Sequence, residues 1–122
     1  MSSTRDRIAN YYPAIDRVDT EAVLSLFAAD AVYKRADREY RSLPEIREFF
    51  CKKRQIRGRH IIDQIWADTA DRKVVVTGRF EGEGVAGDPR TVEFADVWQF
   101  NDAGLVSKRQ TFLALGHAYV ER

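Results

Sequence analysis

The chain has 122 residues, of which 44% are hydrophobic and 32% charged, and its 20 Lys and Arg against 19 Asp and Glu leave a net charge of +1. This length suits one core, so we expect a single domain over residues 1–122. No apolar run approaches the ~20 residues of a membrane span, and the near-neutral charge argues against nucleic acid as a partner. The N-terminus lacks an apolar secretion signal and Cys51 is the single cysteine, so we expect a cytoplasmic protein.

The first part of the chain is predicted to be helical. Apolar residues recur at helical spacing near residues 5–18 and give that helix one apolar face: Ile8, Tyr11, Tyr12, Ile15 and Val18. Pro13 lies inside this helix and removes a backbone donor, so we expect a kink there. Asp19 suits the N-cap of a second helix near residues 20–28.

Two short strands, residues 31–34 and 39–41, are expected next. The sequence Ser-Leu-Pro-Glu at residues 42–45 then has the form of a capping box, in which the serine caps a helix and the glutamate binds back to the capping residue. It predicts that a third helix begins there and runs to about residue 54.

The second half of the chain changes to the two-residue period of β-strands. Four strands are predicted, over residues 59–68, 73–81, 91–101 and 105–115. Their connections are short, and a parallel crossover would need about a dozen residues or more, so the strands form an antiparallel meander. The chain is therefore predicted to be an α+β domain with helices first and a sheet after.

One predicted strand carries an acid among aromatic residues. Strict alternation puts five residues on one face: Val92, Phe94, Asp96, Trp98 and Phe100. Burying an unpaired carboxylate costs several kcal/mol, so Asp96 is expected either to find a partner, such as a neighbouring Arg, Tyr or backbone amide, or to stay protonated. Arg109, on the following strand, is a candidate partner. Asp96 is thus either a pocket residue or a structural acid.

His60 is the second candidate for proton chemistry. It lies on the strand 59–68 and, by alternation, shares a face with Ile62, Gln64 and Trp66. Histidine transfers protons near neutral pH, which favours an acid/base role, but a lone histidine can also be structural. The sequence has no metal-ligand spacing of His, Cys or carboxylates, so it predicts no metal site and no cofactor.

The order of these elements is similar to a known family. The segments DRVDTEAVLSLFAADAV, residues 16–32, and DVWQFNDAGLV, residues 96–106, resemble the nuclear transport factor 2-like superfamily in its SnoaL-like and ketosteroid isomerase-like branch. The resemblance implies a cone, in which a curved, mainly antiparallel sheet wraps three N-terminal helices around one pocket. It also implies a homodimer that forms through the outer face of the sheet.

The resemblance assigns site residues. The ketosteroid isomerase pattern puts an oxyanion-hole tyrosine at Tyr11 and a protonated oxyanion-hole aspartic acid at Asp96, but its general-base position carries Arg35. This departure argues against a simple ketosteroid isomerase. SnoaL-like cyclases are similar in using a pocket His and Asp, for which His60 and Asp96 are the candidates. Limonene epoxide hydrolase-like members use an Asp-Arg-Asp set, which Arg35 or Arg109 with Asp96 matches in part.

Together these observations predict a cofactor-independent acid/base enzyme of isomerase, cyclase, dehydratase or hydrolase type, acting on an apolar carbonyl or polyketide-like metabolite. Asp96 and Tyr11 are expected to contact the substrate oxygen, and His60 to move the proton. The predicted substrate-binding residues are Arg35, Trp66, Phe94, Trp98, Phe100 and Arg109. The alternative is a non-catalytic ligand-binding or dimerisation module. Apolar residues predicted on the sheet's back favour a homodimer: Ile61, Ile65, Val75, Val97 and Phe112.

Overall fold

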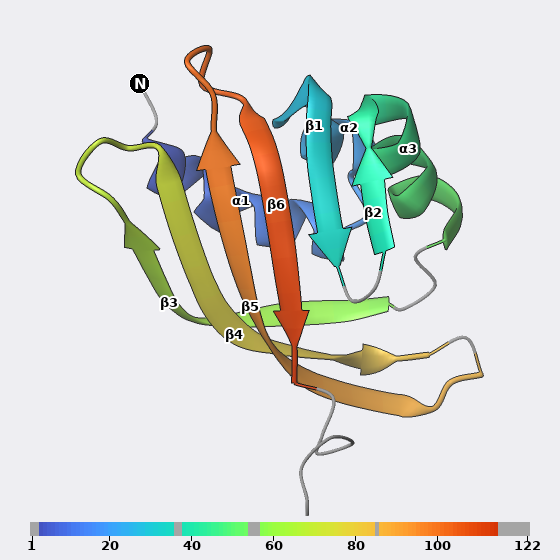
Figure 1. Cartoon of the computed structure of the whole chain (residues 1–122). Coiled ribbons are helices and arrows are strands. Elements are labelled where there is room, and N and C mark those ends of the chain that lie inside the picture. The colour runs from blue at the N-terminus through green and yellow to red at the C-terminus, as the bar shows by residue number, and fades with distance from the viewer. Residues whose placement is uncertain (1–2, 36–37, 54–56, 85, 115–122) are drawn as a thin grey trace, which may run out of the picture.

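A computed structural model describes residues 3–35, 38–53, 57–84 and 86–114. The helices are α1 (Thr4–Asp16), α2 (Thr20–Leu24), α3 (Ser42–Glu48) and the π-helix η1 (Phe49–Lys53). The strands are β1 (Phe27–Arg35), β2 (Arg38–Arg41), β3 (Arg57–Ala67), β4 (Lys73–Glu83), β5 (Pro89–Phe100) and β6 (Val106–Leu113). One open, strongly curved sheet runs in the order β2-β1-β6-β5-β4-β3, with the helices against its concave face (Figure 1).

The sheet is mainly antiparallel. Strands β3 to β6 form the predicted meander, and β1 pairs with β2 in the same antiparallel sense. Strand β1 also runs parallel to β6, which joins the first half of the chain to the second. The predicted α+β class and the curved, helix-filled sheet are therefore confirmed.

Helix α1 is fixed at its N-terminal end by polar contacts. The Ser3 side chain caps it by accepting from the Asp6 amide, 3.1 Å away. The Thr4 amide, at 3.2 Å, and the Thr4 hydroxyl both donate to the Asp71 carboxylate in the β3–β4 turn. Asp19 caps α2 as predicted, because its side chain accepts from the Ala22 amide at 3.2 Å. Helix α1 is thereby anchored to the sheet.

Two predictions about the helices differ from the structure. The second helix ends at Leu24 rather than near residue 28, because Phe27 pairs with Val106 in the parallel ladder and already belongs to β1. The capping box forms only in half. The Glu45 carboxylate accepts from the Arg41 amide at 3.0 Å, whereas Ser42 has φ 76° and is not the capping residue.

A bulge in β3 sets the curvature and reverses the strand's alternation. The register with β4 shifts between Ile62 and Gln64. Nearby, the backbones of β3 and β4 approach so closely that a Cβ on Gly78 would lie 2.3 Å from the Ile61 carbonyl oxygen. Beyond the bulge Ile65 packs against the core, and Trp66 is 50% exposed. The prediction that Trp66 shares the face of His60 was wrong, because the extra residue turns it outward.

The core lies between α1, α3, η1 and the concave face of the sheet. Its largest buried side chains include Ile8, Tyr12, Tyr33, Ile46 and Trp98, and burying an apolar side chain of this size contributes about 1.5–3 kcal/mol. None of the described helices combines the length and the apolar character that a membrane-crossing helix needs.

Candidate active site

A cavity of about 540 Å³ lies next to this core. Its lining comes from α1, η1 and strands β1 and β3 to β6, and includes Tyr11, Tyr33, Arg35, Phe49, Phe50, His60, Phe80, Arg90, Phe94, Asp96, Arg109, Thr111 and Leu113. The sheet's curvature thus brings polar side chains from several strands against one aromatic wall.

Asp96 and Arg109 form a buried ion pair in this cavity. Arg109 Nη2 lies 2.9 Å from Asp96 Oδ2, and Arg109 Nε lies 3.3 Å from Asp96 Oδ1. The two residues are only 1% and 4% exposed. The guanidinium carbon lies 4.4 Å from the Trp98 ring centroid and 4.6 Å from that of Tyr33. Aromatic faces and one carboxylate therefore stabilise the buried cation.

Asp96 accepts from every donor that surrounds it. Besides the two bonds from Arg109, it accepts from the Tyr12 hydroxyl at 2.6 Å and from the Thr111 hydroxyl. The structure therefore pairs Asp96 with Arg109, which is one of the two outcomes that the sequence left open.

Tyr12 is a member of this network that sequence reasoning missed. Its hydroxyl donates to Asp96 and accepts from Trp98 Nε1 at 3.2 Å. Burial, followed by the negative charge of Asp96, raises the pKa of Tyr12 well above its ordinary value. Tyr11 and Tyr12 both lie on the apolar face of α1, so helical spacing did not show which of them binds Asp96.

Tyr11 lies in the same cavity but binds Arg109. Arg109 Nη1 donates to the Tyr11 hydroxyl at 2.6 Å. Burial opposes the charge of Arg109, yet Asp96 and the tyrosine hydroxyls outweigh it, so the pKa of Arg109 is raised above its ordinary value. The guanidinium consequently remains charged and orients Tyr11 toward the cavity's polar end.

His60 binds Asp16, the last residue of α1. His60 Nδ1 lies 2.6 Å from Asp16 Oδ1, and the His60 amide donates to Asp16 Oδ2 at 2.8 Å. The two side chains are 12% and 18% exposed. Because a carboxylate accepts, Nδ1 is the donor in this contact. The sequence predicted His60 but gave no signal for Asp16, whose position depends on how α1 packs against β3.

The cavity brings together six of the predicted site residues: Tyr11, Arg35, His60, Phe94, Asp96 and Arg109. Trp98 and Phe100 are buried in the core and do not belong to the cavity lining. Trp66 lies outside the cavity because of the bulge. Among the described residues no group of three or more His, Cys, Asp or Glu side chains could bind a metal ion.

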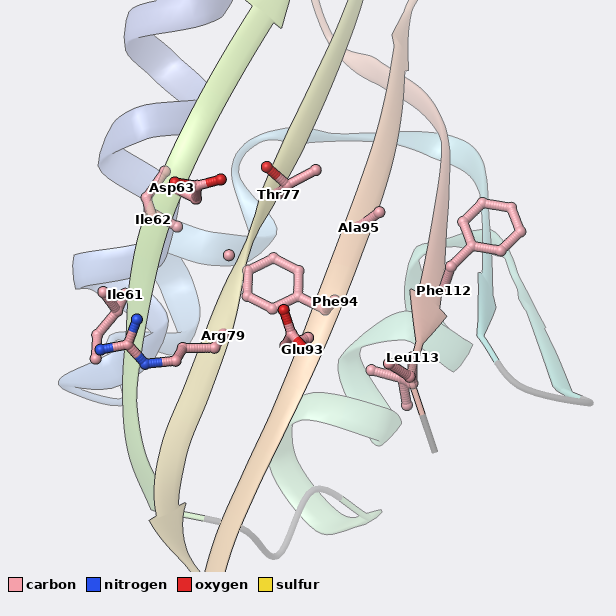
Figure 2. A pocket seen from close by; sticks show the side chains of 12 residues that line it. Ile61, Ile62, Asp63, Thr77, Arg79, Glu93, Phe94, Ala95, Phe112 and Leu113 are labelled. Atoms are coloured by element: carbon pink, nitrogen blue, oxygen red, sulfur yellow. The ribbon is translucent and has the colours of Figure 1, made fainter. Parts of the chain in front are cut away.

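A second hollow, of about 780 Å³, lies on the opposite face of the sheet. Thr77, Ala95 and Phe112 pair across β4, β5 and β6 and alternate with the cavity residues, and Figure 2 shows their side chains lining this hollow together with Arg79 and Glu93. Phe112 is 50% exposed there. The predicted outer-face position of Ile65 was wrong, since that side chain packs against the core beyond the bulge.

The order of elements and the curved sheet around the helices define the nuclear transport factor 2-like fold. The chain belongs to the SnoaL-like domain family, whose model matches residues 8–108. A comparison with curated proteins found no match.

Solved structures agree on the fold. A nuclear transport factor 2-like protein of unknown function from Burkholderia pseudomallei is 22% identical, with a TM-score of 0.80 over 92% of this chain and 91% of that one. A candidate polyketide cyclase from Pseudomonas putida is 14% identical, with a TM-score of 0.84 over 92% of each chain. SalBIII, an epoxide hydrolase/cyclase-like enzyme in pyran ring formation in the polyether salinomycin, is 14% identical, with a TM-score of 0.79 over 92% of this chain and 91% of SalBIII.

Proposed function

We propose that this protein is a cofactor-independent acid/base enzyme that acts on a small, largely apolar molecule bearing a carbonyl group, with His60 as its general base. The observation that carries the proposal is that His60, bound by Asp16, and Arg109, bound by Asp96, line one cavity. A proton acceptor, His60, and a cation, Arg109, thus line the same cavity.

His60 supplies the proton transfer. Its Nδ1 proton is donated to Asp16, so Nε2 takes a proton from the carbon next to the substrate carbonyl. The imidazolium that forms lies against the Asp16 carboxylate, which stabilises the new positive charge. The same nitrogen then returns the proton to another position of the substrate, and the enzyme regains its starting state.

Arg109 and Tyr11 stabilise the charge that develops on the substrate oxygen. Removal of the proton leaves an enolate, whose oxygen needs hydrogen-bond donors that are already in place. The Arg109 guanidinium is fixed by Asp96 and by the Tyr11 hydroxyl, and both Arg109 and Tyr11 line the cavity. Phe80, Phe94 and neighbouring aromatic side chains contact the apolar body.

Non-catalytic ligand binding is the alternative. The Asp96–Arg109 pair favours it, because the pair satisfies its own charge and hydrogen bonds without a substrate. In such a protein His60 and Asp16 would be a structural contact between α1 and β3. The two candidates differ in one measurable respect, since only the enzyme moves protons on its ligand.

Hydrogen–deuterium exchange tests the proposal. β-Tetralone and related apolar cyclic ketones are incubated with the protein in D₂O, and loss of the α-proton signal is followed by NMR. The wild type is expected to accelerate exchange over buffer, and His60→Gln to lower the enzymatic rate by about 10²–10⁴-fold. Gln64→Ala, an exposed change on the same strand, serves as the control. Binding without acceleration of exchange supports the binding module instead.

A further inference from the structure

The basic side chains that line the cavity differ in whether an acidic side chain pairs with them. Arg109 pairs with Asp96, at 2.9 Å, and His60 binds Asp16. Arg90 contacts the partly exposed carboxylate of Asp88. Each of these three basic groups therefore has an acidic partner supplied by the protein.

Arg35 differs from the other basic groups of the cavity. It is the last residue of β1 and is partly buried. Its Nη1 donates to the Tyr33 hydroxyl at 3.2 Å, and its guanidinium carbon lies 5.0 Å from the Phe49 ring centroid. No ion pair joins Arg35 to a carboxylate in the part of the chain that the structure describes. A positive charge thus faces the cavity beside a hydroxyl and an aromatic ring, with Arg38 as its cross-strand neighbour and no carboxylate paired to it among the described residues.

A fixed guanidinium in this setting suits one kind of ligand group. Removing charge from water is costly unless an opposite charge meets it, and a planar guanidinium binds a carboxylate through two parallel hydrogen bonds. The Tyr33 hydroxyl and the Phe49 ring restrain the side chain before a ligand binds, which lowers the entropy that binding would cost. Aromatic residues next to it, Phe49 and Phe50, offer an apolar surface rather than further cations.

We infer that the ligand of this cavity is an apolar molecule that carries a carboxylate, and that Arg35 binds the carboxylate. The inference deepens the proposed function, on which it rests for the identity of the site, because it narrows the substrate class to carbonyl compounds that are also acids. One carboxylate charge matches the one cation of the described cavity lining that has no carboxylate partner, whereas a phosphate dianion would require a second cation.

The matched probes β-naphthoate and β-naphthamide test this inference, because they share an apolar body and differ in charge. Their Kd values are measured by isothermal titration calorimetry with the wild type, Arg35→Gln and Arg35→Lys. Arg5→Gln is the control, because Arg5 is an exposed residue of α1 outside the cavity lining and its loss changes the net charge equally. Thermal unfolding of each variant verifies that it is folded.

The wild type and the control Arg5→Gln are expected to bind the acid at least tenfold more tightly than the amide. Arg35→Gln is expected to lose this preference, and Arg35→Lys to retain part of it. Three results would overturn the inference: equal binding of the two probes by the wild type, an acid preference that survives in Arg35→Gln, or no binding of either probe. The deuterium-exchange assay separates this inference from the proposed function, because it reports proton transfer on the substrate and not binding of the acid. If acid binding depends on Arg35 but proton exchange does not depend on His60, the inferred ligand class stands and the catalytic proposal fails.

Discussion

His60 Nδ1 lies 2.6 Å from Asp16 Oδ1 although 44 positions separate the two residues in the chain. The contact joins the last residue of α1 to β3 and sets both the orientation and the tautomer of the imidazole. Because the same helix carries Tyr11 and Tyr12, α1 positions the general base of the proposed reaction and also contacts both members of the Asp96–Arg109 pair.

Asp96→Asn is expected to destabilise the protein by about 3–5 kcal/mol, because it leaves the Arg109 cation buried without its carboxylate. Urea denaturation measures the loss. Asp30→Asn, which removes an exposed carboxylate from β1, is the control and should change the free energy of unfolding by less than about 0.5 kcal/mol. A loss below about 1 kcal/mol for Asp96→Asn would show that the ion pair is not structural.

Tyr12→Phe tests the hydroxyl beneath the cavity and its dependence on pH. The variant leaves Asp96 short of one donor and Trp98 Nε1 without its acceptor, so we expect a loss of about 1–3 kcal/mol at neutral pH. The pKa of Tyr12 is raised in the folded state, so above about pH 10 the unfolded chain releases a proton that the folded chain keeps.

The free energy of unfolding that the Tyr12 hydroxyl contributes is therefore fully present below about pH 10 and is lost as the pH rises further. The difference in unfolding free energy between wild type and Tyr12→Phe should narrow above this pH, which urea denaturation at several pH values measures. A difference that stays constant from neutral pH to pH 11 or so would contradict the raised pKa.

We also predict that the protein forms a homodimer through the outer face of the sheet. Phe112 is 50% exposed there, beside the 780 Å³ hollow shown in Figure 2, and exposed apolar surface of this kind favours association. Sedimentation is expected to show a dimer for the wild type at micromolar concentration and a monomer for Phe112→Asp. The control is Val18→Asn, at an apolar residue that is 43% exposed between α1 and α2. A monomeric wild type would contradict the prediction.

Val18→Asn should itself stabilise the fold. Val18 has φ 60°, a left-handed conformation that is costly for a β-branched side chain and much less so for asparagine. We expect a gain of about 0.5–1 kcal/mol in the free energy of unfolding, measured by urea denaturation. An unchanged or lowered value would show that contacts of the valine side chain outweigh the backbone strain.

Regular patterns in the sequence predicted most of the fold and part of the site. Alternation along β5 and β6 was enough to place Asp96 and Arg109 on one face of the sheet. Asp96 lies opposite Thr111 and Arg109 opposite Trp98, so the ion pair joins diagonal neighbours. Trp66 was misplaced because the bulge in β3 leaves no clear mark in the sequence. Asp16 and Tyr12 were missed because helix-to-sheet packing, which no local pattern encodes, brings them to His60 and Asp96.

The tautomer of His60 is the most direct test of the proposed base. ¹⁵N NMR of the imidazole near pH 8 is expected to show the proton on Nδ1 in the wild type, because the Asp16 carboxylate accepts it. In Asp16→Asn this tautomer should lose its dominance, and the rate of ketone α-proton exchange should fall more than about tenfold. A wild-type imidazole protonated on Nε2, or an exchange rate unchanged by Asp16→Asn, would contradict the role of His60 as the base oriented by Asp16.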